Sequence, residues 1–540
     1  MQGIEAIARI LKMEGVEFIS GFPQNFLFDA AAQEGIRCII SRNERVGVGM
    51  ADGYARASFA QKIGVCAMQN GPGIENSFSG IAQAYSESVP ILALPSGFAI
   101  RRMVPPNFIA SKGYRDITKW ADTVYFADQV PDMMRRAFTC LRAGRPGPVL
   151  LEIPMDINNQ EIDDFTYTPV KPVRSAGDPA DVKEVAKALI EAKNPVIRAG
   201  QGVLFAQAWD ELKELAELLQ IPVFTTMSGK SAFPEDHPLA LGAGGRTRPK
   251  MVVTFLNKAD LVFAVGSSCT KEAFTTPIPD DKRVIQTTVD ERDINKDYNV
   301  EHAIIGDAKL VLRQIIEEVK AQGGRQTTAD VASAIARIKD DWLEEWLPKL
   351  ISDEKPVNPY RVVSDLMKTL DRNETIITHD SGNPRDELVP FWETLIPGGY
   401  IGWGKSTTLG GSLGFAMGAK LARPDKLCVA FMGNAAFGMV GMDFETAVRE
   451  NIPILVVVVN NSLLGGYNRM HAVASEKYNL NVQSGEYAKV AEALGGYGEK
   501  VTEPDEIVPA VERARASVES GKAALLEIIT AEEPAFSLYQ

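Results

Sequence analysis

The chain is poor in the side chains that build disulfide scaffolds and clustered metal sites. Its 540 residues include 5 cysteines and 4 histidines. The cysteines are scattered, without the CxxC spacing of zinc or redox motifs, and most sit in apolar runs where a buried free thiol is the simplest interpretation. None of the histidines has metal-ligand spacing. The pattern argues against a disulfide framework and predicts a reducing, cytoplasmic location.

Positive charge and long apolar runs are also scarce. Lys and Arg number 57 against 70 Asp and Glu, a net charge of −13, which disfavours general attraction to nucleic acid or to an anionic membrane. No apolar run approaches the roughly 18 residues of a membrane span. The opening MQGIEAIARILKMEGVEF has amphipathic helical spacing with acidic residues, unlike a signal peptide. We therefore expect neither a nucleic-acid nor a membrane partner.

The length and the polar breaks predict three domains. A soft prior of roughly 150 residues per domain suggests three or four units. Two polar, proline-containing stretches, one after Ile157 and one ending at Tyr360, divide the chain. The predicted domains span 1–165, 178–325 and 355–540.

Each predicted domain alternates short apolar runs with longer periodic ones. GVCAM and PILVVVV are apolar throughout and do not alternate, and PVIRAG is apolar except for Arg198. Such runs are typical of strands buried on both faces, so we expect parallel sheets covered by helices. The predicted fold class is α/β, with a mainly parallel sheet flanked by helices in each domain.

The stretch MGNAAFGMVGMDFETAVRENIPILVVVVNN, which begins at Met432, predicts a turn, a helix, a strand and a stop. Gly433 permits a tight turn, and the amides of Ala435 and Ala436 then open a helix whose positive end attracts anions. The strand brings Asn461 to the same sheet edge as Asn434. Oxygen ligands beside a diphosphate suit Mg²⁺. Ordinary turn chemistry is the alternative explanation.

This stretch resembles the diphosphate and magnesium motif of the thiamine diphosphate enzymes, which begins Gly-Asp-Gly or Gly-Asp-Ala/Ser and ends in Asn-Asn. Four other segments are similar to the acetolactate synthase, pyruvate oxidase and 2-hydroxyacyl-CoA lyase group: RNERVGVGMADGYAR, NGPGIENSFSGIAQAYSESVPIL, GRPGPVLLEIPMDI and GKSTTLGGSLGFAMGAK. The resemblance spans nearly the whole chain. It implies a pyrimidine-binding first domain, a Rossmann-like middle domain and a diphosphate-binding last domain, with thiamine diphosphate and Mg²⁺ as cofactors.

The resemblance assigns roles on the pyrimidine side of the cofactor. Glu44 matches the carboxylate that hydrogen-bonds N1′ of the aminopyrimidine, and a proton shared there helps the 4′ nitrogen to deprotonate the thiazolium C2. The carbonyl of Thr407 would accept from the 4′-amino group. Leu409 would prop the cofactor into its bent form, although packing alone would also explain a leucine there.

On the diphosphate side, the resemblance places Gly382 and Asn383 near the phosphates. It makes Asn434, Asn461 and the backbone of Leu463 the metal ligands. The family has aspartate where this chain has Asn434, so a negative charge is missing beside the metal. We therefore predict looser cofactor retention and a higher magnesium requirement. The substitution also leaves open a catalytically silent binding protein with this fold.

The loop GFPQNF is predicted to face the reacting centre. Gln24 and Asn25 would offer neutral hydrogen bonds to the substrate. The alternative is a helix cap, with Asn25 leading into FLFDAAAQ.

Two substrate classes stay open. An acetolactate-synthase-like activity would decarboxylate a 2-oxo acid such as pyruvate and join it to a second carbonyl compound. An activity like that of 2-hydroxyacyl-CoA lyase or oxalyl-CoA decarboxylase, which AFGMVGMDFETAVRENIP resembles most, would use an acyl-CoA. In that case GGRTRPK would supply Arg246, Arg248 and Lys250 for nucleotide phosphates, unless it is a solvated basic turn.

Two further expectations concern the middle domain and the assembly. RAGQGV contains Gly200 and Gly202, an incomplete dinucleotide signature; a tight strand–helix turn is favoured over FAD or ADP binding. In the family the cofactor spans two chains. The resemblance therefore implies that Glu44 and Asn461 meet across a subunit boundary, which makes a dimer obligatory, with a tetramer expected.

Overall fold

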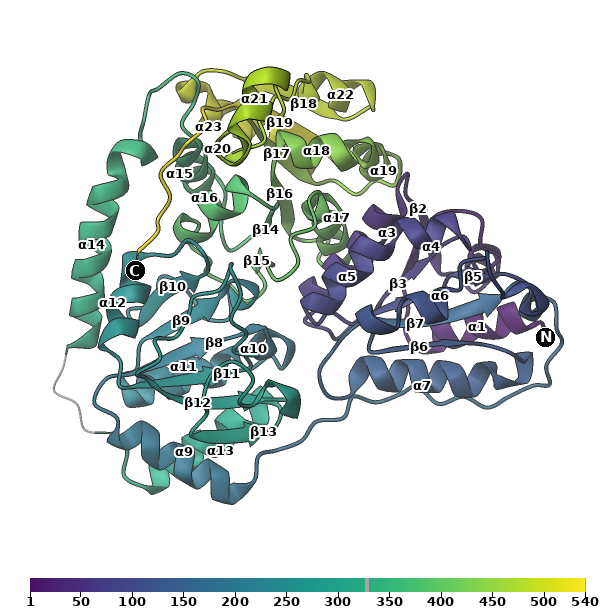
Figure 1. Ribbon diagram of the computed structural model, residues 1–540, viewed down its shortest axis with the longest axis horizontal. Helices are drawn as coiled ribbons and strands as arrows, with labels where there is room; N and C mark the ends of the chain where they lie inside the picture. Colours follow the sequence, from purple (N-terminus) through teal and green to yellow (C-terminus); the bar gives the residue numbers. More distant parts are fainter. Residues whose placement is uncertain (326–329, 540) are drawn as a thin grey trace.

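The computed structural model describes residues 1–325 and 330–539. It contains three sheets, each with helices against it (Figure 1). All strand pairings within these sheets are parallel. Strand β17 (Leu455–Asn460) is buried along its whole length, which explains its unbroken apolar sequence. The predicted α/β class with three parallel sheets is confirmed.

The first domain has a seven-stranded sheet in the order β2-β1-β3-β4-β7-β5, with β6 also paired to β7. Its strands are β1 (Phe18–Gly21), β2 (Arg37–Ile40), β3 (Gly64–Ala67), β4 (Ile91–Ala93), β5 (Ser96–Gly97), β6 (Trp120–Thr123) and β7 (Val149–Pro154). Its helices are α1 (Gly3–Met13), α2 (Leu27–Gln33), α3 (Glu44–Ala57), α4 (Pro72–Asn76), α5 (Phe78–Ser86), α6 (Ala110–Gly113), α7 (Val130–Arg142) and α8 (Met155–Asn158).

The middle domain has a six-stranded sheet in the order β10-β9-β8-β11-β12-β13. Its strands are β8 (Pro195–Ala199), β9 (Val223–Thr226), β10 (Ala240–Gly244), β11 (Leu261–Val265), β12 (Arg283–Thr288) and β13 (His302–Ile305). Its helices are α9 (Pro179–Glu191), α10 (Gln201–Phe205), α11 (Trp209–Leu219), α12 (Lys250–Lys258) and α13 (Ala308–Ala321), with a short 3-10 helix η4 (Met227–Gly229).

The third domain also has a six-stranded sheet, in the order β15-β14-β16-β17-β19-β18. Its remaining strands are β14 (Thr375–His379), β15 (Tyr400–Ile401), β16 (Leu427–Gly433), β18 (Tyr497–Val501) and β19 (Ala524–Ile529). Its helices are α15 (Pro359–Thr369), α16 (Asn383–Phe391), α17 (Gly411–Ala422), α18 (Asn434–Val440), α19 (Phe444–Arg449), α20 (Tyr467–Met470), α21 (Ala472–Tyr478), α22 (Tyr487–Ala493) and α23 (Ile507–Glu519).

The second polar break contains a long helix. Helix α14 (Val331–Leu350) stands beside α15 and α12 at the edge of the molecule (Figure 1). Trp342 and Trp346 pack on Phe391, with ring centroids 4.8 and 5.1 Å apart. Only one face of α14 is apolar, so the sequence of this stretch is polar on average. The helix nevertheless packs on the third domain through its apolar face.

The first and third domains pack on each other within one chain. Helix α3 crosses α17 at backbone contact: a Cβ placed on Gly414 would lie 2.9 Å from the Cα of Gly49. Glycine is required on both helices at this crossing. The contact fixes the helix that begins at Glu44 against the domain that carries the phosphate motif.

Among the described residues, no helix is both long enough and apolar enough to cross a bilayer.

Candidate functional site

The predicted phosphate motif lies where β16 passes into α18. Gly433 has a φ of −84°, which any residue adopts, so the expected tight turn is a direct passage from strand to helix. A Cβ on Gly433 would lie 3.4 Å from Cγ of Pro384, which limits space. No described side chain caps the start of α18. The first amides of a helix have no acceptor within it, so those of Ala435 and Ala436 suit an anion.

The three predicted metal ligands lie together at the ends of two neighbouring strands. The side-chain Nδ2 of Asn434 donates to the carbonyl oxygen of Leu463 over 3.5 Å. Asn461 is the next residue but one before Leu463, and its Oδ1 accepts from the Leu463 amide at 3.0 Å. The end of β16 and the segment after β17 therefore present two side-chain amides and one carbonyl to one place.

The first asparagine of the Asn-Asn pair has a structural task. Asn460 ends β17, and its Nδ2 donates to Oε1 of Glu527 on β19 at 2.7 Å. Its Oδ1 accepts from the amide of Ser462 at 2.9 Å. Ser462 has a φ of +57°, a left-handed conformation that turns the chain out of the sheet. This turn carries Asn461 and Leu463 to the sheet edge.

The donor set fits Mg²⁺ beside a diphosphate. Within residues 1–325 and 330–539, no group of three or more His, Cys, Asp or Glu could hold a metal ion. Side-chain amide and backbone carbonyl oxygens are hard ligands of the kind that Mg²⁺ takes, with phosphate oxygens completing the shell. Because the Asn434, Asn461 and Leu463 oxygens carry no formal charge, the negative charge at such a metal would come from the diphosphate.

The loop before α16 adjoins this group. Gly382 has a φ of +88° and caps α16, and a Cβ placed on it would meet nothing within 4 Å. Asn383 lies against Gly465, where an added Cβ would stand 2.7 Å from its Nδ2. The predicted diphosphate residues therefore border the segment that carries Leu463.

The loop that contains Thr407 and Leu409 is fixed at its end by Asp380. This buried carboxylate accepts from the amides of Gly410 and Ser412 at 2.9 and 3.1 Å, and from the Ser412 hydroxyl at 2.5 Å. Burial raises the pKa of Asp380, while these donors act against that rise. Leu409 is partly buried and packs on the core of the third domain. This packing is compatible with the alternative explanation for a leucine there, and the role of Leu409 toward the cofactor stays a prediction.

The start of the same loop rests on His379. Its ring stacks on Trp403 with centroids 5.0 Å apart, and its Nε2 accepts from the Trp403 amide at 3.3 Å. Burial holds the pKa of His379 well below its usual value, so the ring is neutral. The expectation that His379 is structural agrees with these contacts.

Glu44 begins α3 and is 7% exposed. Its Oε2 accepts from Nδ2 of Asn76 at 3.3 Å, and a Cβ on Gly73 would stand 3.4 Å from its Oε1. Within the described part of this chain, no hydrogen bond joins Glu44 to Asn434 or Asn461. Glu44 is therefore not bonded to the predicted metal ligands of its own protomer.

Asp443 holds the chain just before Glu44. Its two oxygens accept from the amides of Arg42 and Asn43 at 2.7 and 3.0 Å. Burial raises the pKa of Asp443 to about 6. A carboxylate of the third domain thereby positions the first turn of α3.

The GFPQNF loop separates its two amides. Gln24 is exposed, whereas Asn25 is buried. Nδ2 of Asn25 donates to the carbonyls of Met68 and Leu94 at 3.1 and 2.9 Å, and its Oδ1 accepts from the Leu27 amide at 3.0 Å. Asn25 is not itself the N-cap of α2, which is Phe26, but its bond to Leu27 fixes the chain where this helix begins. A catalytic role for Gln24 and Asn25 stays a prediction.

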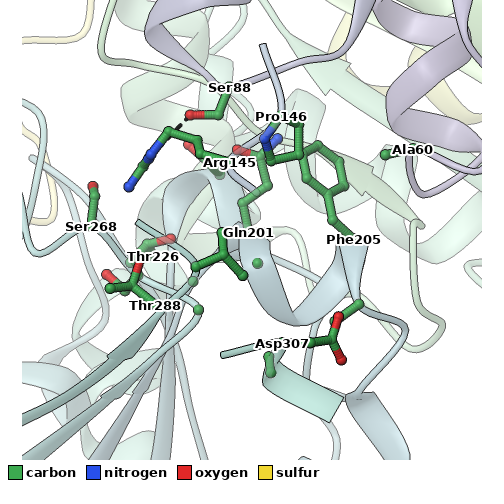
Figure 2. Close-up of a pocket in the computed structure, with 18 of the residues that line it drawn as sticks. Ala60, Ser88, Arg145, Pro146, Gln201, Phe205, Thr226, Ser268, Thr288 and Asp307 are labelled. Carbon is green, nitrogen blue, oxygen red and sulfur yellow. Dashed lines mark hydrogen bonds between the residues drawn. The ribbon is translucent and has the colours of Figure 1, made fainter. Parts of the chain in front are cut away.

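A cavity of about 280 Å³ opens at the carboxyl ends of β8, β11 and β12. Figure 2 shows Gln201 and Phe205 of α10 projecting into it, with Arg145 bonded to Ser88 on the opposite side. Gly200 and Gly202 line it. A Cβ on Gly202 would stand 2.8 Å from the Cα of Gly266, so these glycines make the expected tight turn. Whether FAD or ADP enters the cavity stays a prediction.

The basic residues of the GGRTRPK segment do not line this cavity, although its first residue, Gly244, does. Arg246 pairs with Asp386 at 3.0 Å, and Lys250 approaches Glu345 at 3.5 Å. Arg248 donates to the carbonyl of Tyr539 at 2.9 Å, where the chain's final segment reaches α12 (Figure 1). These cations have partners within the chain, so their expected role toward nucleotide phosphates gains no support.

Sequence reasoning missed the carboxylates that organise the site. Asp380, Asp443 and Glu87 each accept two or more backbone amides from another part of the chain. The only signal for Asp380 was its place directly after an apolar strand. Glu87, at the end of α5, and Asp443, in a helical stretch, resemble ordinary surface acids in the sequence.

Known families match all three domains. The description "Thiamine pyrophosphate enzyme, N-terminal TPP binding domain" matches residues 1–104, the central domain matches 182–315, and the C-terminal TPP binding domain matches 380–528. A probable acetolactate synthase large subunit of Methanocaldococcus jannaschii is 31% identical over 98% of this chain and 92% of its own. The chain belongs to the thiamine pyrophosphate enzymes.

Other members of this family are similar over comparable spans. A probable acetolactate synthase large subunit of Methanococcus aeolicus is 30% identical over 95% of this chain and 90% of its own. A glyoxylate carboligase of Escherichia coli O157:H7 is 28% identical over 96% of this chain and 91% of its own. The protein is thus a thiamine diphosphate-dependent enzyme of the acetolactate synthase and pyruvate oxidase superfamily, as the sequence motifs predict.

Proposed function

We propose that the enzyme decarboxylates a 2-oxo acid and joins the product to a second carbonyl compound, as an acetolactate synthase does. The observation that carries this proposal is the convergence of Asn434, Asn461 and Leu463 beside the free start of α18. The similarity to acetolactate synthase large subunits and to a glyoxylate carboligase supports a small 2-oxo acid as the donor.

The proposed roles follow from what each residue presents. When bound, thiamine diphosphate supplies a nucleophilic thiazolium carbon and an electron sink for cleavage of the neighbouring C–C bond. The amides of Ala435 and Ala436 and the open backbone at Gly382 would hold its diphosphate. Glu44 would hold the proton on N1′, and the buried setting of this carboxylate keeps water from competing for it.

The side chains of Asn434 and Asn461 and the carbonyl of Leu463 would hold Mg²⁺. In the structure the Asn434 amide nitrogen faces Leu463. A metal between them requires the amide to turn its oxygen inward, and amide orientation is set by hydrogen bonding. Because Asn434 supplies no formal charge, we expect weaker metal retention than an aspartate would give.

An acyl-CoA substrate is the alternative. The pairing of Arg246 and Lys250 with acidic side chains, and of Arg248 with the chain's last residues, favours the free 2-oxo acid. A binding protein without activity is the second alternative, and the comparisons lend it no support.

We also propose that the enzyme works as a dimer or tetramer. Large apolar side chains are exposed on α5, on α18 and just after α18, namely Phe78, Tyr85, Met439 and Met442. Such surface suits a protein partner, and a second copy would bring Glu44 to the other protomer's phosphate motif.

All five cysteines are free, which supports the cytoplasmic expectation.

Product analysis tests this function. The protein, loaded with thiamine diphosphate and Mg²⁺, is incubated with pyruvate, glyoxylate, oxalyl-CoA or a 2-hydroxyacyl-CoA. The proposal predicts carbon dioxide and a carboligation product from a free 2-oxo acid. Turnover of a CoA thioester alone would establish the first alternative. Absence of any cofactor-induced thermal shift would favour the silent protein.

A flavin absorbance in the purified protein, or a thermal shift with ADP, would identify an occupant of the middle-domain cavity.

A further inference from the structure

Helix α5 faces the loop that carries Thr407 and Leu409. Ser79 and Gln83 lie on one side of this helix, and Glu87, four residues after Gln83, caps its end on the same side. The carbonyl of Ser79 accepts from the Thr408 hydroxyl at 3.4 Å, and Oε1 of Gln83 accepts from the Thr408 amide at 3.4 Å. The first domain thus contacts this loop of the third domain within the same chain.

Glu87 makes the strongest of these contacts. It is 0% exposed. Its Oε1 accepts from the amides of Gly404 and Lys405 at 2.7 and 2.6 Å. Its Oε2 accepts from the hydroxyl of Ser228, on η4 of the middle domain, at 2.6 Å. One carboxylate of the first domain therefore binds groups of both other domains.

The loop has little freedom at this point. Gly404 packs on the side chain of Met227, the residue before Ser228. A few residues further on, Asp380 holds Gly410. The segment between these anchors includes Thr407 and Leu409. Its start is held by Glu87 and its end by Asp380, and both acceptors are buried carboxylates, which bind amides more strongly than neutral groups do.

We propose that Glu87 is a positioning residue of the cofactor site, which sets the loop 404–409 in the conformation that presents the Thr407 carbonyl and the Leu409 side chain. The consequence for the cofactor rests on the proposed roles of Thr407 and Leu409. The restraint on the loop does not depend on those roles. Glu87 acts from the same chain as the loop, whereas Glu44 is expected to serve the partner's site.

Hydrogen exchange of the cofactor-free protein tests the restraint. Replacing Glu87 by alanine removes both amide acceptors, so peptides covering Gly404 and Lys405 should exchange roughly tenfold or more faster. Glu87→Gln keeps an oxygen for the two amides but loses the charge, so its loop should exchange faster than that of the wild type and more slowly than that of Glu87→Ala. Glu87→Asp, one methylene shorter, cannot reach both Ser228 and the loop and should exchange faster; it also serves if the alanine variant does not fold.

Glu152 provides a matched control. It is a buried carboxylate that accepts from the amides of Ala110 and Ser111 wholly within the first domain. Glu152→Ala should destabilise that domain and leave exchange at 404–409 unchanged. Loop exchange equal to the wild type in Glu87→Ala and Glu87→Asp would overturn the proposal. So would an equal acceleration across all three domains.

Ligand binding tests the consequence for the cofactor. The dissociation constant of thiamine diphosphate with Mg²⁺ should rise roughly tenfold or more in Glu87→Ala. That of inorganic pyrophosphate with Mg²⁺ should not change, because α18 and Asn434 lie elsewhere. Equal weakening of both ligands would contradict a role limited to the loop. If the wild type binds no thiamine diphosphate, the proposed function fails, and the exchange measurement still decides whether Glu87 restrains the loop.

Discussion

The side-chain amide of Asn434 and the carbonyl oxygen of Leu463 are 3.5 Å apart, although 29 residues separate them in the chain. This pairing joins the ends of β16 and β17 at the predicted metal position. The resemblance implies an aspartate where this chain has the uncharged Asn434. Asn434→Asp should therefore lower the Mg²⁺ concentration for half-maximal cofactor binding roughly tenfold, which corresponds to about 1.4 kcal/mol. Titration of Mg²⁺ at fixed thiamine diphosphate measures it.

The control for this titration is Asn460→Asp, in the same strand-end motif. Asn460 bonds to Glu527, so an added carboxylate there should destabilise the protein without lowering the Mg²⁺ requirement. An unchanged requirement in Asn434→Asp would show that residue 434 is not a ligand.

Glu44→Gln should abolish most of the activity and leave the fold intact. Glutamine keeps the shape and can still accept from Asn76, but it cannot hold a proton on the cofactor. We expect a rate loss of roughly 100-fold or more, with little change in thermal stability. Glu512→Gln, exposed on α23, is the comparison that should retain full activity. Wild-type turnover in Glu44→Gln would exclude the assigned role.

Asp443 makes stability depend on pH. Its folded pKa of about 6 exceeds the ordinary value of 3.8, so the carboxyl contributes most to stability below pH 4, and that contribution is lost as the pH rises to 6. Asp443→Asn does not titrate. The free energy of unfolding of the wild type minus that of Asp443→Asn should therefore fall by up to about 3 kcal/mol between pH 3.5 and 6.5. A pH-independent difference, measured by chemical denaturation, would refute the assignment.

The buried pair Lys230 and Glu235 joins the middle and third domains. Nζ of Lys230 lies 2.6 Å from both oxygens of Glu235, and Oε2 of Glu235 accepts from the Thr394 amide at 2.7 Å. Glu235→Ala should cost about 3–5 kcal/mol, because it leaves a buried ammonium without its partner. Adding Lys230→Met should restore much of that loss. If the double variant is no more stable than Glu235→Ala, the cost does not come from the unpaired charge.

Much of the fold could be predicted from local pattern. Strands such as PILVVVV are buried on both faces, so their sequences are apolar without alternation, and they predicted parallel sheets correctly. Helix α14 was harder to predict because its tryptophans are spaced among charged residues, and the surrounding stretch has the composition of a linker. The domain boundaries stay predictions.

The part of the site formed by one short sequence motif could be predicted from the sequence. Asn434, Asn461 and Leu463 converge because strand order and the turn at Ser462 follow from a contiguous segment. Glu87 and Asp443 could not be found this way. Their function depends on amides that are hundreds of residues away in the sequence, and only the packing of three domains brings these groups together.

Subunit complementation tests the central claim, that Glu44 of one protomer serves the phosphate motif of the other. Glu44→Gln and Asn461→Ala chains are co-expressed with different tags, and the mixed dimers are compared with each pure variant. If the site spans two chains, every mixed dimer has one intact site and one doubly altered site. Mixed dimers purified through both tags should then have about half of wild-type activity per chain, and the unsorted mixture from random pairing about a quarter. If Glu44 and Asn461 of the same chain act together, no mixed dimer has an intact site, and activity no higher than that of the pure variants would contradict the account.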